Sequence, residues 1–325
     1  MKCLLCYSNN LLERDHISAN QISDLYGPDF REIILEELKG VSSISYVECL
    51  NCGLHFFYPP ISASEKFYNL KNKSESYYLD EKQEYVFAKN FIDPSKNVLE
   101  IGCGKGAFAK HIKPKAYTGL EFSSDAIRLA NQEGISVIRT DIQNFSKNCD
   151  QKFDVVCFFQ VLEHIPNPHL FIESALSCLG NNGLMIVSVP NNDTYLSLML
   201  GCALNMPPHH VTRWTVKAVS SIAKIFDLDF IDMDFEQLSD LHLNDFANTV
   251  ALKLLEPALN GERVLDNSLK VKIKRRIAHY CIAPFISKAF EDHRIRPKGH
   301  SISAVFKKNL YQKNFWSKSM AGREG

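Results

Sequence analysis

The sequence lacks a surplus of either charge. Its 325 residues include 37 Lys and Arg and 37 Asp and Glu, and no repeat or low-complexity tract interrupts them. Proteins that bind nucleic acid neutralise phosphates and usually carry a basic excess. We therefore expect no nucleic-acid partner, although a local basic patch is compatible with the composition.

Long apolar runs are also missing. The longest apolar stretch near the middle, residues 195–208, is far shorter than the roughly 20 residues that span a bilayer. The first residues turn polar at Tyr7-Ser8, which leaves no apolar core for a secretory signal. We expect a soluble, cytoplasmic chain without a transmembrane segment, whose ten cysteines are mostly reduced thiols.

Four of the cysteines form two CxxC pairs, Cys3 with Cys6 and Cys49 with Cys52. Four thiolates at this spacing suit a tetrahedral zinc ion, and such a closed site is structural because it leaves no open position for catalysis. Residues 7–48 separate the pairs and must form an insert or hairpin. His55 follows the second pair but is redundant as a ligand. The alternative is four unrelated reduced cysteines.

From residue 96 onward, apolar runs alternate with helical patterns, which predicts an α/β fold with a parallel sheet covered by helices. The expected strands are 97–101, 116–121, 136–139, 153–159, 184–189, 229–235 and 301–306. The expected helices are 107–112, 124–133, 168–179 and 215–226, with Gly180 as the stop of the third.

This pattern divides the chain into six parts. They are a zinc-ribbon-like module at 1–60, a helical linker or cap at 61–95, a Rossmann-like core at 96–239, a helical insert at 240–297, the final strand of the core at 298–310, and a tail at 311–325. The insert carries a basic stretch within 270–296. That stretch either contacts an acidic substrate or membrane surface or is a solvated helix face.

A glycine-rich turn lies between the first strand of this core and its helix. Gly102, Gly104 and Gly106 allow a tight turn and a close approach of a ligand to the helix N-terminus. The spacing is GxGxG and not the GxGxxG of the dinucleotide fold. Glu121, at the end of the next strand, can accept the ribose hydroxyls of an adenosine ligand. Asp141 can accept from the adenine amine, or it can cap a turn.

The segments VLEIGCGKG (98–106), GLEFS (119–123), TDI (140–142) and FDVVCFFQVLEHI (153–165) together resemble the class I S-adenosylmethionine-dependent methyltransferases. The final strand at 301–306 fits the antiparallel seventh strand of that family. The resemblance implies a doubly wound, Rossmann-like seven-stranded sheet and S-adenosylmethionine as cofactor. It also implies that Glu163 and His164 are mostly structural.

The same resemblance assigns cofactor residues. It places Glu100, Gly102, Gly104 and Lys105 along the methionine part, Glu121 at the ribose, Phe122 and Ile142 beside the adenine, Asp141 at the adenine amine, and Gln160 and Val161 beside the methyl-donor sulfur.

A four-cysteine module before such a domain resembles bacterial methyltransferases of sugar and natural-product pathways, including deoxysugar C-methyltransferases. Those enzymes carry a further C-terminal domain for which this chain is too short. The resemblance implies a small-molecule or glycan acceptor and leaves oxygen, nitrogen and carbon open as the methylated atom.

A second candidate segment follows the fifth strand. Within residues 206–214, His209 and His210 can supply a general base near neutral pH. Arg213 can bind an anionic substrate group and Trp214 can wall the pocket, with Tyr195 as a further lining residue. The alternative is a rigid turn in which the histidines cap the next helix.

The predicted function is methyl transfer from S-adenosylmethionine to a small-molecule or glycan acceptor. The alternative from another class is a zinc-containing, S-adenosylmethionine-binding regulatory protein without turnover. A methyltransferase acting on RNA or protein is a third possibility, and the neutral charge and the lack of an RNA-binding module weigh against RNA.

Overall fold

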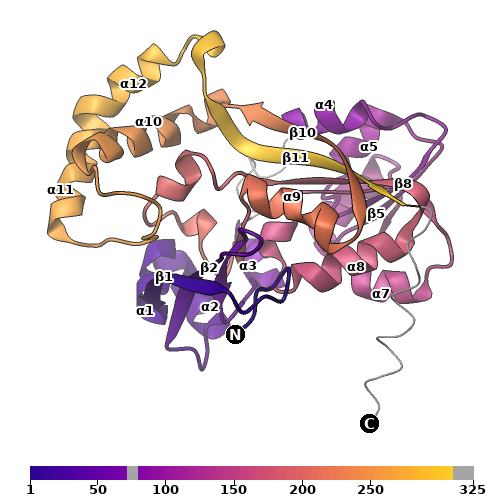
Figure 1. Ribbon diagram of the computed structural model, residues 1–325, viewed down its shortest axis with the longest axis horizontal. Helices are drawn as coiled ribbons and strands as arrows, with labels where there is room; N and C mark the ends of the chain where they lie inside the picture. Colours follow the sequence, from indigo (N-terminus) through magenta and orange to yellow (C-terminus); the bar gives the residue numbers. More distant parts are fainter. Residues whose placement is uncertain (72–79, 310–325) are drawn as a thin grey trace.

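A computed structural model describes residues 1–71 and 80–309 of the chain (Figure 1). The N-terminal module lies below a large sheet, and α10, α11 and α12 form a helical lobe at the opposite end from α7 and α8 (Figure 1). The predicted tail at 311–325 and residues 72–79 of the predicted linker lie outside the described residues.

The large sheet has seven strands in the order β10-β11-β8-β7-β4-β5-β6. Neighbouring strands from β6 to β8 are parallel, and β11 is antiparallel to both β8 and β10. The strands are β4 (Asn97–Ile101), β5 (Ala116–Leu120), β6 (Val137–Ile138), β7 (Phe153–Phe159), β8 (Leu179–Pro190), β10 (Leu228–Gln237) and β11 (Lys298–Lys308). The predicted doubly wound, Rossmann-like seven-stranded sheet is therefore confirmed.

Helices cover both faces of this sheet. They are α4 (Gln83–Lys89), α5 (Ala107–Ile112), α6 (Ser124–Gln132), α7 (Ile142–Asn148), α8 (Pro168–Cys178) and α9 (Val216–Ile225). Alternate residues of β7 enter two separate cores, because successive side chains of a strand point to opposite faces. Val156 and Phe158 pack in the core beneath α8 and α9, whereas Val155 and Phe159 pack with α4 and α5.

The N-terminal module is a smaller sheet that is completed by a distant strand. It contains β1 (Leu11–Ser18), α1 (Ala19–Tyr26), α2 (Pro28–Glu37), β2 (Ser43–Cys49) and β3 (His55–Tyr58). Its fourth strand is β9 (Thr212–Arg213), which pairs with β3 although it follows β8 of the large sheet in the chain. The insert predicted between the cysteine pairs is thus a strand followed by two helices and the start of β2.

The insert before the last strand is helical, with α10 (Asp240–Leu255), α11 (Leu269–Ile277), a π-helical turn η4 (Ala278–Ile282) and α12 (Ala283–Ala289). The remaining elements are short: α3 (Glu65–Lys71), η1 (Leu162–His164), η2 (Tyr195–Leu198), η3 (Ala203–Asn205) and η5 (His293–Ile295). Within the described residues no helix is long and apolar enough to cross a membrane.

Two local predictions differ from the structure. The third helix ends at Cys178 with extended backbone at Leu179, so β8 begins before Gly180, which was expected to stop the helix. The helix α7 was not expected, because it has seven mostly polar residues and its signal is the N-cap Asp141, whose side chain accepts from the backbone N–H of Asn144.

Candidate active site

The glycine-rich turn joins β4 to α5 in a backbone conformation that other residues rarely adopt. Gly102, Gly104 and Gly106 have φ values of 73°, 55° and 75°. A Cβ atom at Gly102 would lie 2.6 Å from Cγ2 of Val161, in the turn after β7. The absence of a side chain at Gly102 therefore brings two of the predicted cofactor segments into direct contact.

Glu121 ties the turn to the end of β5. Its Oε2 accepts a 2.9 Å hydrogen bond from the N–H of Gly104, and its Oε1 accepts from the N–H groups of Phe122 and Ser123. Phe122 is 59% exposed, whereas Ile142 is buried. Asp141 caps α7 through both carboxylate oxygens, which bond to Asn144.

Glu100 lies beneath the turn and is fully buried. Its Oε2 accepts a 2.5 Å hydrogen bond from the hydroxyl of Tyr117. Burial raises the pKa of Glu100 to about 8, and the Tyr117 hydrogen bond opposes this shift. Lys105 forms a 2.8 Å ion pair with Asp80 at the surface of the same turn.

Gln160 and Val161 occupy the sharp bend after β7. Gln160 has φ of 56°, an uncommon conformation for a residue other than glycine, and its side-chain amide donates to Ser301 Oγ at 3.1 Å. The turn after β4, the turn after β7 and Glu121 all lie at the carboxyl ends of parallel strands. The strand order reverses at β4, and ligands of open α/β sheets bind at such a point.

The loop containing His209 and His210 is anchored to the N-terminal module and to η1, the turn after β7. Val211 donates its N–H to Glu163 O at 2.7 Å, and its own carbonyl accepts from Phe57 of β3 at 2.9 Å. Tyr26 of α1 donates its hydroxyl to Met206 O at 2.7 Å. These bonds bring His209 and His210 against His164, whose ring stacks on His209 with centroids 4.7 Å apart.

The three histidines differ in which ring nitrogens are engaged. His164 Nδ1 donates to His209 O at 2.6 Å. His209 has contacts at both nitrogens, with His164 Nδ1 at 3.2 Å and with the Lys71 ammonium at Nε2. His210 Nδ1 donates to Asn205 Oδ1 at 3.2 Å, which leaves the Nε2 lone pair as its acceptor.

Burial keeps all three imidazoles neutral. Loss of solvation lowers the pKa of His164 to about 4 and lowers the pKa values of His209 and His210 well below 6.5. Burial also lowers the pKa of Lys71 to about 8. The neutral ring has a nitrogen lone pair that can accept a proton, while the same burial disfavours the imidazolium that would form.

Residues 72–232 match the family model described as a methyltransferase domain. The chain carries a methyltransferase domain. It is a member of the S-adenosylmethionine-dependent methyltransferases, as the sequence motifs predicted.

Two relatives carry the name ubiquinone biosynthesis O-methyltransferase. The protein from Glaesserella parasuis is 29% identical over 147 residues, which are 41% of this chain and 59% of that protein. The protein from Actinobacillus pleuropneumoniae is 25% identical over 199 residues, 56% of this chain and 82% of that protein. A solved structure described as a putative methyltransferase from Bacillus halodurans is 14% identical, covers 70% of this chain and all of its own, and has a TM-score of 0.46.

The four cysteines of the two CxxC pairs in this methyltransferase converge in the N-terminal module. Their sulfur atoms all lie within 4.8 Å of one another. Sγ of Cys3 is 3.5 Å from that of Cys52, and Sγ of Cys6 is 3.5 Å from that of Cys49. Sulfurs at zinc-bond distance from one tetrahedral ion would be about 3.8 Å apart. The donor set therefore fits zinc, and His55 is not part of it.

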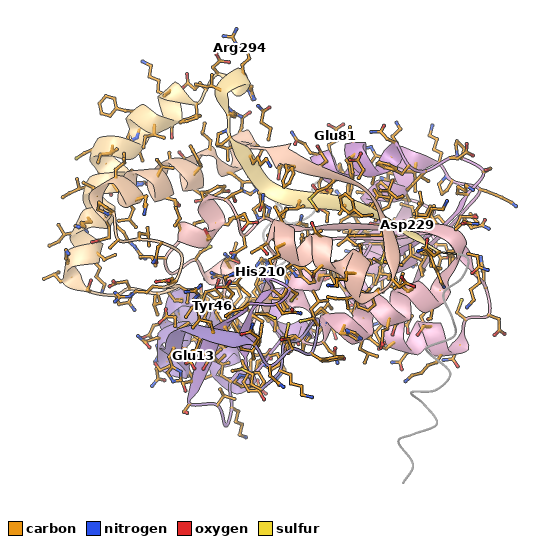
Figure 2. The ribbon with its side chains drawn as sticks, in the orientation of Figure 1. Glu13, Tyr46, Glu81, His210, Asp229 and Arg294 are labelled. Atoms are coloured by element: carbon orange, nitrogen blue, oxygen red, sulfur yellow. The ribbon has the colours of Figure 1, made fainter. Side chains whose placement is uncertain are left out.

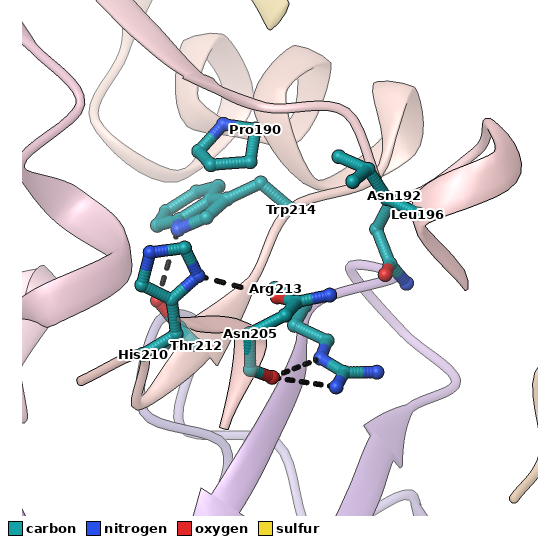
Figure 3. A pocket seen from close by; sticks show the side chains of 8 residues that line it. All are labelled: Pro190, Asn192, Leu196, Asn205, His210, Thr212, Arg213 and Trp214. Atoms are coloured by element: carbon teal, nitrogen blue, oxygen red, sulfur yellow. Dashed lines mark hydrogen bonds between the residues drawn. The ribbon is translucent and has the colours of Figure 1, made fainter. Parts of the chain in front are cut away.

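Arg213, Trp214 and His210 line one pocket with residues of the loop after β8 (Figure 3). Trp214 is fully buried and donates its indole N–H to Thr212 Oγ1 at 2.9 Å. Arg213 is 3% exposed, and its Nε and Nη2 donate to Asn205 O. Tyr195 packs edge-on against Phe246 of α10 and so faces the insert.

Two residues of the candidate site, Lys71 and Asn205, were not predicted from the sequence. His164 stacks on His209, and its expected structural role stays a prediction. Lys71 lies in α3, and no pattern in the sequence links that helix to the loop.

Proposed function

We propose that the chain transfers a methyl group from S-adenosylmethionine to a hydroxyl oxygen of a small-molecule or glycan-linked acceptor, with His210 as the general base. The observation behind the proposal is that Asn205 binds Nδ1 of His210 and leaves its Nε2 as an acceptor beside the pocket. The printed names of the two relatives, which are O-methyltransferases, support oxygen as the methylated atom.

The cofactor would be held by the residues around the glycine-rich turn. S-adenosylmethionine, when bound, supplies a methyl group on a positively charged sulfur. Glu121 would accept the ribose hydroxyls, while its hydrogen bond to Gly104 holds the turn in place. Glu100, Gly102, Gly104 and Lys105 would line the methionine part, Phe122, Asp141 and Ile142 the adenine, and Gln160 and Val161 the sulfur.

His210 is better placed than His209 to remove a proton. A general base needs one free acceptor nitrogen and a partner that orients the ring. Asn205 orients His210 through Nδ1, and His210 lines the pocket in Figure 3. Both nitrogens of His209 already have contacts, so we assign His209 and His164 to holding the ring of His210 in place.

The test compares His210→Gln with His279→Gln. His279 matches His210 in donating Nδ1 to an asparagine oxygen, Asn248 Oδ1 at 2.9 Å, but it lies on the insert. With radiolabelled S-adenosylmethionine and a panel of dihydroxybenzoates and hydroxylated sugars, we expect H210Q to lose about 100-fold or more in turnover. It should still bind S-adenosylhomocysteine in calorimetry, and H279Q should match the unaltered protein. Full turnover by H210Q would disprove the assignment.

The alternative, a regulatory protein that binds S-adenosylmethionine without turnover, predicts a different result. The unaltered protein would bind S-adenosylmethionine in calorimetry, and no acceptor in the panel or in a cell extract would receive the label. The intact cofactor segments, and the names of the two relatives as O-methyltransferases, favour the enzyme.

We also propose that Cys3, Cys6, Cys49 and Cys52 hold a structural zinc ion. The backbone N–H of Leu5 donates to Sγ of Cys3 at 3.4 Å, which helps to stabilise a thiolate. All ten cysteines are free thiols in the structure.

A peripheral contact through the insert is a weaker proposal. Leu269, Ile273, Tyr280 and Phe285 are 74%, 50%, 74% and 75% exposed along one helical run. The predicted stretch at 270–296 contains eight Lys and Arg against two acidic residues, Glu291 and Asp292. An exposed apolar stripe with basic flanks is typical of helices that bind anionic lipid surfaces. Flotation with vesicles containing phosphatidylglycerol tests it: Tyr280→Ser with Phe285→Ser should abolish co-flotation, and unchanged co-flotation would refute it.

A further inference from the structure

Arg213 is a buried cation whose described partners carry no charge. Its guanidinium donates to the carbonyl of Asn205 and approaches the sulfur of Met206. Its Cζ lies 5.0 Å and 5.2 Å from the ring centroids of Tyr46 and Phe57. Within residues 1–71 and 80–309, its Nη1 finds no hydrogen-bond partner.

Another buried arginine shows what full pairing looks like in this chain. Arg296 donates to Asp240 Oδ1 at 2.6 Å, to Leu238 O at 3.1 Å and to Phe290 O at 2.7 Å. Buried charges are normally paired in this way, since an isolated buried charge is costly. A buried arginine with an unpaired N–H group, as at Arg213, is therefore unusual both in this molecule and in proteins in general.

The residues around Arg213 also carry unpaired polar atoms. Tyr46 Oη and His55 Nδ1 in the N-terminal sheet, and Asn192 Oδ1 after β8, are buried without a partner in the described part of the chain. His55 is the cross-strand neighbour of Arg213, and the Tyr46 ring lies 5.5 Å from that of His55. Figure 2 places the labels of Tyr46 and His210 at the junction between the N-terminal module and the large sheet.

The nearby carboxylates are engaged elsewhere. Glu48 pairs with Arg14 at 2.5 Å, and Asp193 accepts the N–H of Val216 at 2.7 Å. Within the described residues, neither of them forms an ion pair with Arg213. The unpaired Arg213 Nη1 and Tyr46 hydroxyl are donors, and neutral His55 can donate from Nδ1.

We propose that Arg213, Tyr46 and His55 form a binding site for an oxyanion, a carboxylate or phosphate carried by the methyl acceptor. The inference rests on the proposed function in one respect, because the site adjoins the pocket that His210 lines (Figure 3). It assigns the N-terminal module a part in acceptor binding that a structural zinc site alone does not explain. The acceptor then carries a hydroxyl at His210 and a negative charge at Arg213.

The first test is direct binding. Inorganic phosphate, benzoate and chloride are titrated at constant ionic strength, with S-adenosylhomocysteine present, and followed by calorimetry and thermal unfolding. We expect saturable binding of phosphate or benzoate and none of chloride. The arm that saturates at lower concentration distinguishes phosphate from carboxylate. If neither anion saturates, water alone satisfies these groups and the proposal is wrong.

Variants assign the binding to these residues. Arg213→Met should weaken anion binding by about tenfold or more, since it removes a charged donor. Tyr46→Phe should weaken it by roughly threefold, as expected for one neutral hydrogen bond, and it keeps the fold if R213M fails to fold. Arg296→Met is the matched control and should bind the anion as the unaltered protein does. Unchanged binding by both R213M and Y46F would overturn the proposal.

The outcome is separable from the methyl-transfer proposal. His210→Gln should bind the anion normally although it loses turnover. Turnover with neutral acceptors and no anion binding would leave the base assignment standing and remove the oxyanion site. Anion binding without turnover on any acceptor would leave the oxyanion site standing and remove the base assignment.

Discussion

The contact between the glycine-rich turn and Val161 can be measured as a change in the free energy of unfolding. Gly102 makes this contact, and Gly134 and Gly119 serve as comparisons. Gly102→Ala combines two costs: a left-handed backbone, worth about 1–2 kcal/mol for a residue with Cβ, and overlap with Val161, worth about 1–3 kcal/mol. Gly134 has φ of 72° and no atom within 4 Å of an added Cβ, so Gly134→Ala carries the backbone cost alone. Gly119 has no positive φ, but a Cβ added there would lie 2.5 Å from Cys103 Sγ, so Gly119→Ala carries the overlap cost alone.

We expect the free energy of unfolding in urea to fall by about 2–5 kcal/mol for G102A, by about 1–2 for G134A and by about 1–3 for G119A. Adding Val161→Ala to G102A should recover the overlap cost, which appears as a coupling energy of about 1–3 kcal/mol in a double-mutant cycle. S-adenosylhomocysteine binding should weaken in G102A and stay unchanged in G134A. If G102A costs no more than G134A and V161A gives no recovery, the two turns do not touch as described.

The remaining predictions concern pH, zinc and the core. Glu100 has a folded pKa near 8 against an ordinary value of 4.5, so the folded chain retains a proton that the unfolded chain loses; stability should therefore fall as pH rises from about 4.5 to 8. Glu100→Gln should make the fall of the urea midpoint over that range shallower, with part of the slope left because burial also raises the pKa of Glu163 to about 8. An unchanged slope would contradict the assignment. Zinc released by a thiol reagent and measured with a metallochromic dye should amount to about one ion per chain. Cys49→Ser should release none, and the control Cys281→Ser, which changes an exposed thiol, should release the full amount. Trp214→Ala should cost about 3–5 kcal/mol of unfolding free energy, and a loss below about 1 kcal/mol would show that the indole is not fully packed.

Much of the catalytic sheet could be predicted because its signals are local. The strands 97–101 and 153–159 and the helix 107–112 appear over the expected residues, since each is a short apolar pattern next to glycine or a turn. The four cysteines converge as their spacing predicted. The role of each predicted cofactor residue stays a prediction, although their segments do meet at one edge of the sheet.

The acceptor side could not be predicted to the same depth. The contacts of His210 with Asn205 and of His209 with Lys71 join segments whose approach depends on the packing of two sheets. The sequence left His209 and His210 equivalent, and only their hydrogen-bond partners separate them. The unpaired Nη1 of Arg213 results from the lack of an acceptor near it in the folded chain, and no pattern in a single sequence indicates such a lack.

The completion of the N-terminal sheet by the late strand β9 has a consequence for the order of synthesis. The hydroxyl of Thr215, next to β9, bonds to Gly53 O across 162 residues of chain. At about 5–20 residues per second, the edge of β3 must wait roughly 8–30 s on the ribosome for its partner strand. An unpaired edge can recruit other strands meanwhile. The cysteine pairs are both made before that interval begins, so early zinc capture would hold the nascent module in its register until β9 arrives.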